Sequence, residues 1–307
     1  MAWWEALVLG VVQGLTEFFP VSSSGHLVMT EDLLGLTLPG VAFDVALHVA
    51  TLISVVIVYW KTLVRLVLGC LGLGEGTTWP YVLKLGLASV PAAVVGVLFK
   101  DWFEARFDDP LFAGTMVLVT GSVVWSSRWV GEGARPTVLD LAPTAIAAAV
   151  SVVAGTVVPF LAVLGMQAAI MTLSRATATA DWHAEPTWSG AGFMGIAQAL
   201  AILPGISRSG STVLAGLWRR IDPEAAAEFS FLMSIPAILG AAVLSLPDMT
   251  SAEAAATGGV PLAVGALSAG IAGVFAIRFF VRMLRRRSFH AFAFYCWIVG
   301  AAFILTL

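Results

Sequence analysis

The stretch QGLTEFFPVSSSGH, residues 13–26, is far more polar than the sequence around it. It follows an apolar run from Trp3 to Val12 in a chain of 307 residues, of which 59% are hydrophobic and 11% are charged. It contains a carboxamide, a carboxylate, three consecutive hydroxyls and an imidazole, with a proline and glycines that interrupt a helix. In lipid, irregular polar backbone persists only where protein or a water-filled cavity surrounds it. We therefore expect this stretch to hold the functional site.

A second polar stretch, PGISRSGST at residues 204–212, repeats the pattern of the first. Both copies contain Gln-x-Leu followed by Ser-x-Ser-Gly, and the matched positions differ by a constant offset (198 − 13 = 185). The first copy supplies an acid and an imidazole, Glu17 and His26, whereas the second supplies a fixed cation, Arg208. The duplication predicts two related halves and an extra apolar connection with a polar loop between them: residues 1–135, 190–307 and 136–189.

The composition is typical of a membrane protein with several crossings, because soluble domains are about a quarter charged. The N-terminal run carries Glu5 and lacks both the basic segment and the small-residue cleavage site of a signal peptide. Cys70 and Cys296 show no spacing typical of a disulfide or a metal site. We expect no nucleic-acid partner.

Apolar segments of nearly spanning length recur along the chain. A crossing needs about 20 largely apolar residues, and the segments that approach this length are 41–60, 81–99, 111–125, 229–246, 260–281 and 290–307. The polar breaks at 20–25 and 204–212 interrupt apolar sequence and predict two re-entrant helix–loop–helix segments. The expected fold is an all-α polytopic integral membrane protein. Its inverted-topology repeat would bring the two re-entrant segments together near mid-membrane.

Basic residues set the expected orientation, since cytoplasmic loops are enriched in Lys and Arg. The basic groups expected in the cytoplasm are Lys61/Arg65, Arg128/Arg135, Arg219/Arg220 and the cluster within 282–287, and the acidic loop at 101–109 is expected outside. The first polar stretch then opens to the outside and the second to the cytoplasm. Because both ends of 136–189 are then cytoplasmic, the apolar run 143–173 is expected to form a hairpin or to lie in the membrane interface.

Arg208 lies among hydroxyls in a glycine-containing turn that opens a helix. A guanidinium offers a planar fork of donors, and a helix N-terminus offers backbone N–H groups to an anion. An arginine that merely snorkels to the membrane interface needs no such hydroxyl neighbours. The pattern therefore favours a phosphate site.

Glu17 lies four residues after Gln13, which places a carboxylate and an amide on one helical face. Together they can hold a ligand, a metal or a water molecule. His26 follows three hydroxyls, which favours a nucleophilic or proton-transfer role. Asp44 and His48, one turn apart, are expected to be an ordinary satisfied pair, and Glu228 is expected to be a carboxylate at a helix N-terminus.

With these motifs the chain resembles the bacterial undecaprenyl-diphosphate phosphatase family, also called the bacitracin-resistance family. Gln13 and Glu17 match the family's (Glu/Gln)-x-x-x-Glu motif, and residues 204–212 match its Pro-Gly-x-Ser-Arg-Ser-x-x-Thr motif in full. The resemblance covers about residues 3–135 and 190–307. The region 143–185 looks longer than the family's usual connection.

The resemblance implies hydrolysis of undecaprenyl diphosphate to undecaprenyl phosphate and inorganic phosphate, which recycles the carrier lipid of peptidoglycan synthesis. It implies a divalent cation, Mg²⁺ or Ca²⁺, and a multi-pass protein of the bacterial inner membrane whose active site opens to the periplasm. The partners are then a polyprenyl diphosphate lipid and the bilayer, and a homodimer is compatible with the resemblance.

Diphosphate cleavage depends mainly on positioning and on neutralisation of charge, and the motif residues divide accordingly. The expected catalytic residues are Glu17, Ser23, His26 and Arg208. The expected substrate-binding residues are Gln13, Ser22, Ser24, Gly205, Ser207, Ser209 and Thr212. The cation is expected at Glu17 with Gln13, and the nucleophile is Ser23, His26 or a water molecule, with all three left open.

Two other functions compete with hydrolysis of this lipid. A transporter or flippase for a polyprenyl phosphate lipid would use the same inverted repeats and could bind phosphate through Arg208, but it needs no nucleophile. A phosphatase of the phosphatidic acid type would carry an upstream Lys-x6-Arg-Pro and a downstream His-x3-Asp, and the sequence contains neither. Phosphate release in detergent separates an enzyme from a transporter, since detergent leaves no second compartment.

Overall fold

The computed structural model describes residues 1–36, 42–73, 78–107, 109–130, 137–153, 181–245, 258–286 and 288–307, together with positions 165 and 167. Several expected features lie outside these residues. They include Arg135, Arg287 and most of the apolar run 143–173, whose hairpin or interfacial arrangement stays a prediction.

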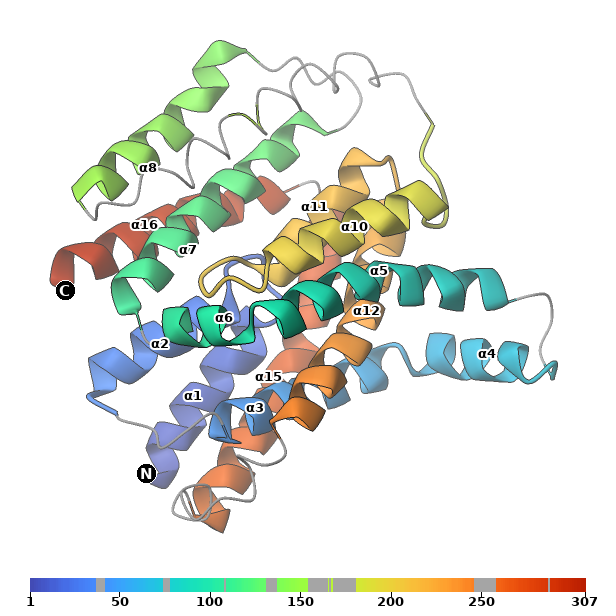
Figure 1. The fold of residues 1–307 in the computed structure, drawn as a ribbon, viewed down its shortest axis with the longest axis horizontal. Coiled ribbons are helices and arrows are strands. Elements are labelled where there is room, and N and C mark those ends of the chain that lie inside the picture. Colours follow the sequence, from blue (N-terminus) through green and yellow to red (C-terminus); the bar gives the residue numbers. More distant parts are fainter. Residues whose placement is uncertain are drawn as a thin grey trace.

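The described chain is helical almost throughout, and strand pairing there is limited to one isolated bridge between His183 and Ile221. The first half contains α1 (Trp3–Thr16), α2 (Ser23–Leu34), α3 (Ala42–Val58), α4 (Trp60–Cys70), α5 (Trp79–Leu98), α6 (Lys100–Phe107), α7 (Pro110–Trp125) and the 3₁₀ turn η1 (Ser126–Trp129). The connection contributes η2 (Val138–Leu141) and α8 (Ala142–Val153). The second half contains α10 (Trp188–Leu200), α11 (Arg208–Trp218), α12 (Pro223–Leu244), α15 (Gly259–Arg285), η3 (Phe289–Ala291) and α16 (Phe292–Thr306) (Figure 1).

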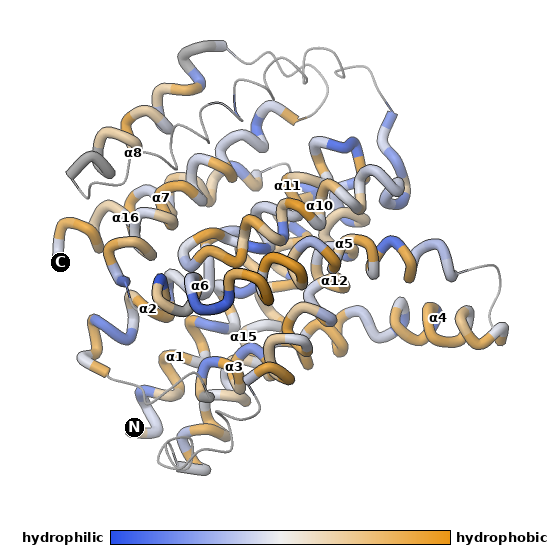
Figure 2. The backbone as a smooth tube through the Cα atoms, viewed as in Figure 1, coloured by the Kyte–Doolittle hydropathy of each residue, from blue (hydrophilic) through white to orange (hydrophobic). Residues whose placement is uncertain are grey.

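Five helical segments in the described residues are long and apolar enough to cross a membrane: Trp79–Leu98, Pro110–Trp129, Pro223–Leu244, Gly259–Arg285 and Phe289–Thr306. A sixth crossing arises if Phe43–Val58 and Trp60–Cys70, which are bent by 79°, form one broken span. Apolar residues run along α4 and α16 (Figure 2). Many large apolar side chains are exposed, which suits a lipid surround. The all-α, multi-pass membrane architecture expected from the sequence is thereby confirmed.

The helices of the two halves pack reciprocally. Helix α1 of the first half lies along α15 of the second, whereas α10 of the second half lies along α5 of the first. In the same way α3 packs on α15 and α12 packs on α5, while α7 and α16 pack on each other. Because each half lays its first helix against the other half, the polar stretches that follow α1 and α10 both reach the centre of the bundle (Figure 1).

Close approach of α1 to α15 depends on two glycines. A Cβ atom at Gly10 would meet the backbone oxygen of Gly265, and a Cβ atom at Gly14 would lie 2.7 Å from Ala272 Cβ and 2.9 Å from the backbone nitrogen of Gly273. Helix association in lipid relies on such close packing, since lipid chains are as apolar as the helices themselves. The glycines therefore set the position of the helix that ends at Glu17.

Replacing Gly14 with alanine is expected to lower the free energy of unfolding by about 1–3 kcal/mol, because the methyl group overpacks the α1–α15 contact. The measurement is the thermal unfolding midpoint of the detergent-solubilised protein. The matched control is Gly86→Ala, because a Cβ atom at Gly86 meets nothing within 4 Å and alanine is the better helix former. A midpoint in Gly14→Ala as high as in Gly86→Ala would contradict the packing argument.

An aromatic cluster anchors the end of α1. The ring of Phe18 is fully buried and contacts Phe231 of α12 edge-on, with ring centroids 5.4 Å apart. Phe231 contacts Phe280 of α15 in the same way at 5.6 Å. Because Phe18 directly follows Glu17, its packing on α12, which in turn packs on α15, holds the neighbouring carboxylate in place.

The break in the first polar stretch ends earlier than expected. Helix α2 begins at Ser23 and includes Gly25, although the sequence suggested a break that runs to Gly25. The reason is Ser22, whose hydroxyl caps the helix and accepts a hydrogen bond from the Gly25 N–H at 3.3 Å. His26 thus lies in the first turn of α2.

The expectation for Glu228 is wrong. Helix α12 begins at Pro223, where Asp222 caps it, so Glu228 lies inside the helix rather than at its N-terminus. Its carboxylate accepts a hydrogen bond from Thr62 of α4 at 3.3 Å. The acidic loop after α5 also differs, since it contains the short helix α6.

Candidate active site

The two polar stretches contact each other directly. The backbone oxygen of Phe19 accepts hydrogen bonds from the hydroxyls of Ser207 at 3.5 Å and Ser209 at 3.0 Å. In return, the N–H of Gly205 donates to the hydroxyl of Ser24 at 3.2 Å. The two stretches, far apart in sequence, therefore form one site.

Glycine is required where the stretches touch. A Cβ atom at Gly25 would lie 2.7 Å from Val117 Cγ2 and 3.1 Å from the Cα of Gly205. Gly205 itself has φ +90, and its Cβ atom would lie 2.5 Å from Met116 Cβ. A side chain at either position would separate the stretches or strain the backbone.

Thr120 of α7 fixes the backbone of the second stretch. Its hydroxyl donates to the oxygen of Gly205 at 2.7 Å and accepts from the N–H of Ser207 at 2.9 Å. A single buried side chain thus pairs two backbone groups in an irregular segment, where each would be costly to leave unpaired.

Both stretches lead into helix N-termini capped by serine. Ser22, at φ 75, caps α2 as described, and Ser207 caps α11 by accepting from the N–H of Gly210 at 3.1 Å. The first N–H groups of a helix have no acceptor within it, and they form the positive end of the helix dipole. Two such ends at one site favour an anion there.

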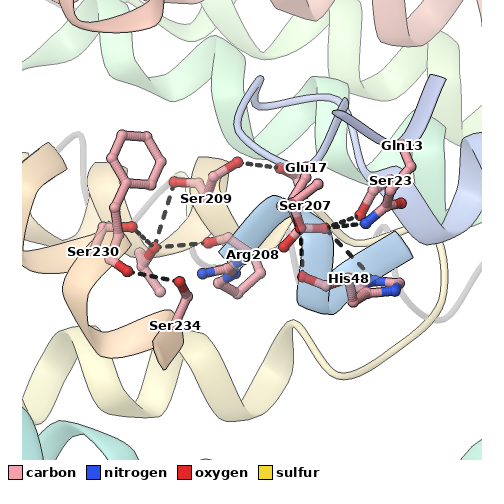
Figure 3. Close-up of polar contacts among 12 residues, drawn as sticks. Gln13, Glu17, Ser23, His48, Ser207, Arg208, Ser209, Ser230 and Ser234 are labelled. Atoms are coloured by element: carbon pink, nitrogen blue, oxygen red, sulfur yellow. Dashed lines mark hydrogen bonds and ion pairs between the residues drawn. The ribbon is translucent and has the colours of Figure 1, made fainter. Parts of the chain in front are cut away.

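Glu17 is the centre of the polar contacts (Figure 3). Its Oε2 atom accepts hydrogen bonds from Gln13 Nε2 at 3.0 Å and from the Ser23 hydroxyl at 2.7 Å. Its Oε1 atom pairs with Nη2 of Arg208 from the other half of the chain. The carboxylate therefore joins the candidate phosphate-binding arginine to a candidate nucleophile.

Arg208 retains an unused donor. Nη2 is paired with Glu17, but Nη1 is buried without a hydrogen-bond partner among the described residues. A buried charged donor without a partner costs free energy, and a phosphate oxygen would satisfy it. The side chain is 17% exposed, so a ligand can reach it.

The polar residues of the site differ in exposure. A ligand can reach those that are partly exposed: Ser23, Ser24, Arg208 and His48. The hydroxyls of Ser22, Ser207, Ser209 and Thr212 are buried, and that of Thr212 bonds with Ser230 at 2.6 Å and donates to the oxygen of Arg208 at 2.8 Å. The buried hydroxyls therefore build the frame of the site.

His26 faces another part of the bundle. Its Nδ1 atom lies 2.7 Å from the backbone oxygen of Ser22 and must donate to it, and its Nε2 atom lies 3.0 Å from the Tyr295 hydroxyl. The two rings are stacked, with centroids 5.6 Å apart. Among the described residues no hydrogen bond or ion pair joins His26 to Glu17, Ser23 or Arg208. Nothing in the sequence indicated Tyr295, which follows His26 by 269 residues.

His48 is the residue of the site that the sequence-based interpretation misplaced. It was expected to form a satisfied pair with Asp44, and that expectation is wrong, because His48 contacts the backbone of Asp44 and the Asp44 Oδ1 atom is buried without a hydrogen-bond partner among the described residues. The His48 Nδ1 atom lies 2.7 Å from the backbone oxygen of Asp44, and its Nε2 atom lies 3.6 Å from Glu17 Oε2. The polar residues Asp44 and His48 in α3 did indicate a functional position, but His48 approaches Glu17 rather than the Asp44 side chain.

The cation is expected at Glu17 with Gln13. The described residues contain no cluster of three His, Cys, Asp or Glu side chains placed to hold a metal. Gln13 Oε1, however, is buried without a hydrogen-bond donor among the described residues, while Nε2 of the same amide donates to the Glu17 carboxylate. Oxygen donors suit Mg²⁺ or Ca²⁺, and Mg²⁺ in particular often takes only one or two protein carboxylates with water and substrate phosphates. Gln13 and Glu17 therefore fit such an ion.

The geometry defines a class of protein: a helical membrane protein with an anion site and an accessible hydroxyl at its centre. Comparison with known families is consistent with this, since the family described as bacitracin resistance protein BacA matches residues 6–302. The chain therefore belongs to the bacitracin resistance protein BacA family.

Curated relatives cover the chain almost completely. A protein of Alkaliphilus metalliredigens named undecaprenyl-diphosphatase is 35% identical over 99% of this chain and 98% of its own length. A protein of the same name from Desulforapulum autotrophicum is 33% identical, with the same coverage of both chains. Undecaprenyl-diphosphatase 4 of Bacillus cereus is 34% identical over 100% of this chain and 98% of its own length.

Proposed function

We propose that the protein hydrolyses undecaprenyl diphosphate to undecaprenyl phosphate and inorganic phosphate, and so recycles the carrier lipid for peptidoglycan synthesis. The observation that carries the proposal is the shared carboxylate of Glu17, which binds Arg208 through one oxygen and the Ser23 hydroxyl through the other. Membership of the BacA family and the names of the relatives support the choice of substrate.

Arg208 and the N-terminus of α11 would bind the terminal phosphate. The Nη1 atom, which has no hydrogen-bond partner in the described part of the chain, and the positive helix end both favour negative charge, and a guanidinium matches the geometry of phosphate oxygens. Ser24 lies partly exposed at the contact with Gly205 and would bind another phosphate oxygen. These donors neutralise the charge that otherwise opposes nucleophilic attack.

Ser23 would be the nucleophile, with Glu17 as its base. The Ser23 hydroxyl is accessible and donates to Glu17 Oε2 at 2.7 Å, within the range for proton transfer. Its oxygen would form a bond to the terminal phosphorus, its proton would pass to Glu17, and the bond from phosphorus to the oxygen of undecaprenyl phosphate would break. Water would then hydrolyse the phosphoserine and release inorganic phosphate. His26 is less suited, since Tyr295 occupies its Nε2 atom.

A divalent cation, Mg²⁺ or Ca²⁺, would be held by Glu17 and Gln13. When bound, such an ion would add positive charge beside the diphosphate. The other roles would fall to side chains of the protein. Gln13 would orient Glu17, Glu17 would hold the Ser23 hydroxyl, and Arg208 would bind phosphate.

The site would open to the periplasmic side of the bacterial inner membrane. The support is the charge distribution, because the basic groups near α4 and at the end of α15 favour the cytoplasm. The reciprocal packing of the halves supports an inverted repeat with re-entrant polar stretches. Assembly as a homodimer stays an expectation.

Purified protein in detergent is expected to release phosphate from undecaprenyl diphosphate, and EDTA is expected to abolish the release. Glu17→Gln should lower the rate by about 10²–10⁴-fold, the usual contribution of a general base. The matched control is Glu5→Gln on the same helix, about 18 Å away by helical rise, which should turn over normally.

The competing flippase predicts a different result. Folded wild-type protein would bind the lipid diphosphate but release no phosphate from it. That outcome would overturn the proposed hydrolysis. The site favours hydrolysis because binding alone needs no hydroxyl paired with a carboxylate.

A further inference from the structure

His26 has no role in the proposed hydrolysis, although it lies in the first turn of α2 close to Ser23. Its imidazole is buried, and both ring nitrogens have partners. The Nδ1 atom donates to the backbone oxygen of Ser22 at 2.7 Å, and the backbone N–H of His26 donates to the same oxygen at 3.2 Å. His26 therefore makes two hydrogen bonds to one peptide group, the group that joins Ser22 to Ser23.

The peptide group held by His26 belongs to a residue in an unfavourable backbone conformation. Ser22 has φ 75 and ψ 105. A residue with a Cβ atom adopts such angles only where the surrounding contacts impose them, and these residues gather at functional sites. Ser23 and the first N–H groups of α2 follow directly, so the conformation of Ser22 decides where they point.

Tyr295 fixes the orientation of the His26 ring. Because Nδ1 donates to a carbonyl oxygen, Nε2 of the neutral ring accepts a hydrogen bond, and the Tyr295 hydroxyl donates it at 3.0 Å. The two rings are nearly parallel, with an angle of 8° between their planes. The hydroxyl and the stacked ring together keep Nδ1 directed at Ser22.

Helix α16, which carries Tyr295, also supports the chain before Ser22. The Cys296 thiol donates to the backbone oxygen of Pro20 at 3.7 Å, and the ring of Phe292 packs on Phe19 with centroids 5.4 Å apart. One helix thus contacts the first polar stretch on both sides of the unfavourable residue. Support of this kind from a second helix is what precise positioning of a reacting group requires.

We propose that Tyr295 and His26 are positioning residues that hold Ser22 in its positive-φ conformation. In this way they aim the Ser23 hydroxyl and the N-terminus of α2 at the terminal phosphate. The proposal deepens the proposed function and rests on Ser23 as its nucleophile. It replaces the nucleophilic or proton-transfer role that the sequence suggested for His26.

Two substitutions of His26 separate positioning from chemistry. The amide nitrogen of an asparagine can donate to the Ser22 oxygen in place of Nδ1, but the amide neither attacks phosphorus nor carries a proton. His26→Ala is expected to lower the single-turnover rate by about 10²-fold, the loss that a misplacement of about 1 Å causes. His26→Asn should keep a rate within about tenfold of the wild type. Equal losses in the two variants would overturn the positioning role.

A second substitution should rescue the first. Glycine adopts positive φ without a steric penalty, and at a helix N-cap it costs little relative to serine. Adding Ser22→Gly to His26→Ala is therefore expected to recover about tenfold of the lost rate. A double variant as slow as His26→Ala would contradict the role assigned to the Ser22 backbone, because glycine cannot replace a lost nucleophile or proton carrier.

Tyr295→Phe keeps the stacked ring and removes the hydroxyl. The expected result is a kcat lower by about two- to tenfold, the equivalent of one hydrogen bond, with KM nearly unchanged. Tyr81→Phe is the matched control, because Tyr81 lies in the first turn of α5 and packs on Phe229 of α12. The same kcat in the two variants would remove Tyr295 from the positioning of Ser23.

Hydrogen exchange of the amides of residues 22–26, followed by mass spectrometry in detergent, needs no turnover. It should be faster in His26→Ala and Tyr295→Phe than in the wild type, because amides that open more often exchange faster. A wild-type protein that releases no phosphate would overturn hydrolysis, and the exchange would still decide whether the two residues hold this turn. Unchanged exchange in both variants would overturn the positioning role even in an active enzyme.

Discussion

Arg208→Ala is expected to lower kcat/KM for undecaprenyl diphosphate by about 10³-fold or more. Arginines that neutralise charge during phosphoryl transfer contribute about 10³–10⁵-fold, and Arg208 carries a buried donor that no described residue pairs with. Removing it also leaves Glu17 without its ionic partner. The unpaired Glu17 carboxylate would then repel the negatively charged diphosphate, which lowers kcat/KM further.

Arg208→Lys separates charge from geometry. Lysine restores the positive charge but not the fork of donors, so it should recover only part of the lost rate. Arg219→Ala is the control for arginine removal from the same helix, because Arg219 is bonded to Ser189 at the far end of α11. Turnover in Arg208→Ala as fast as in Arg219→Ala would remove Arg208 from the site.

Ser23→Ala is expected to abolish the chemical step while leaving lipid binding nearly intact. The hydroxyl is accessible and donates to Glu17 Oε2, and among the described residues the other donor to this oxygen is the amide of Gln13. Loss of a covalent nucleophile removes the two-step route altogether, so single-turnover rates should fall by at least about 10³-fold, as in other enzymes that lose a nucleophile. Acid quenching of the wild type during turnover of ³²P-labelled lipid should trap labelled phosphoserine.

Thr30→Ala is the matched control for loss of a hydroxyl from α2. The Thr30 hydroxyl donates to the backbone oxygen of His26 within the same helix, and its loss should change the single-turnover rate little. A Ser23→Ala protein that keeps the rate of Thr30→Ala would exclude Ser23 as the attacking atom. Direct attack by water, with Glu17 as the base, would then account for the reaction.

Local patterns predicted the parts of the site that lie on one helix. The four-residue spacing of Gln13 and Glu17 predicted that their side chains face the same ligand, and their hydrogen bond of 3.0 Å confirms that they lie together. The duplicated Ser-x-Ser-Gly pattern predicted two matching breaks, and each break ends in a serine-capped helix. These features depend on helical periodicity and capping, which act over a few residues.

Contacts between helices that are distant in the sequence could not be predicted from local patterns. His48 and Tyr295 meet Glu17 and His26 across helix interfaces, and their positions follow from how α3 and α16 pack. The role of Thr120 could not be predicted for the same reason. A threonine in an apolar helix usually hydrogen-bonds to its own helix, whereas Thr120 bonds to the loop at Gly205. Composition fixes which helices cross the membrane, but only packing decides which side chains meet.

The exchange of first helices between the halves also governs how the protein is made. Helix α1 packs against α15, which begins only at Gly259. Synthesis proceeds at roughly 5–20 residues per second, so α15 is made roughly 10–50 s after α1. For most of this time Arg208 has not yet been synthesised, and the aromatic anchor from Phe280 is absent throughout. A nascent chain that stops before α15 thus leaves a polar hairpin without a binding surface, a form suited to recognition by membrane quality control.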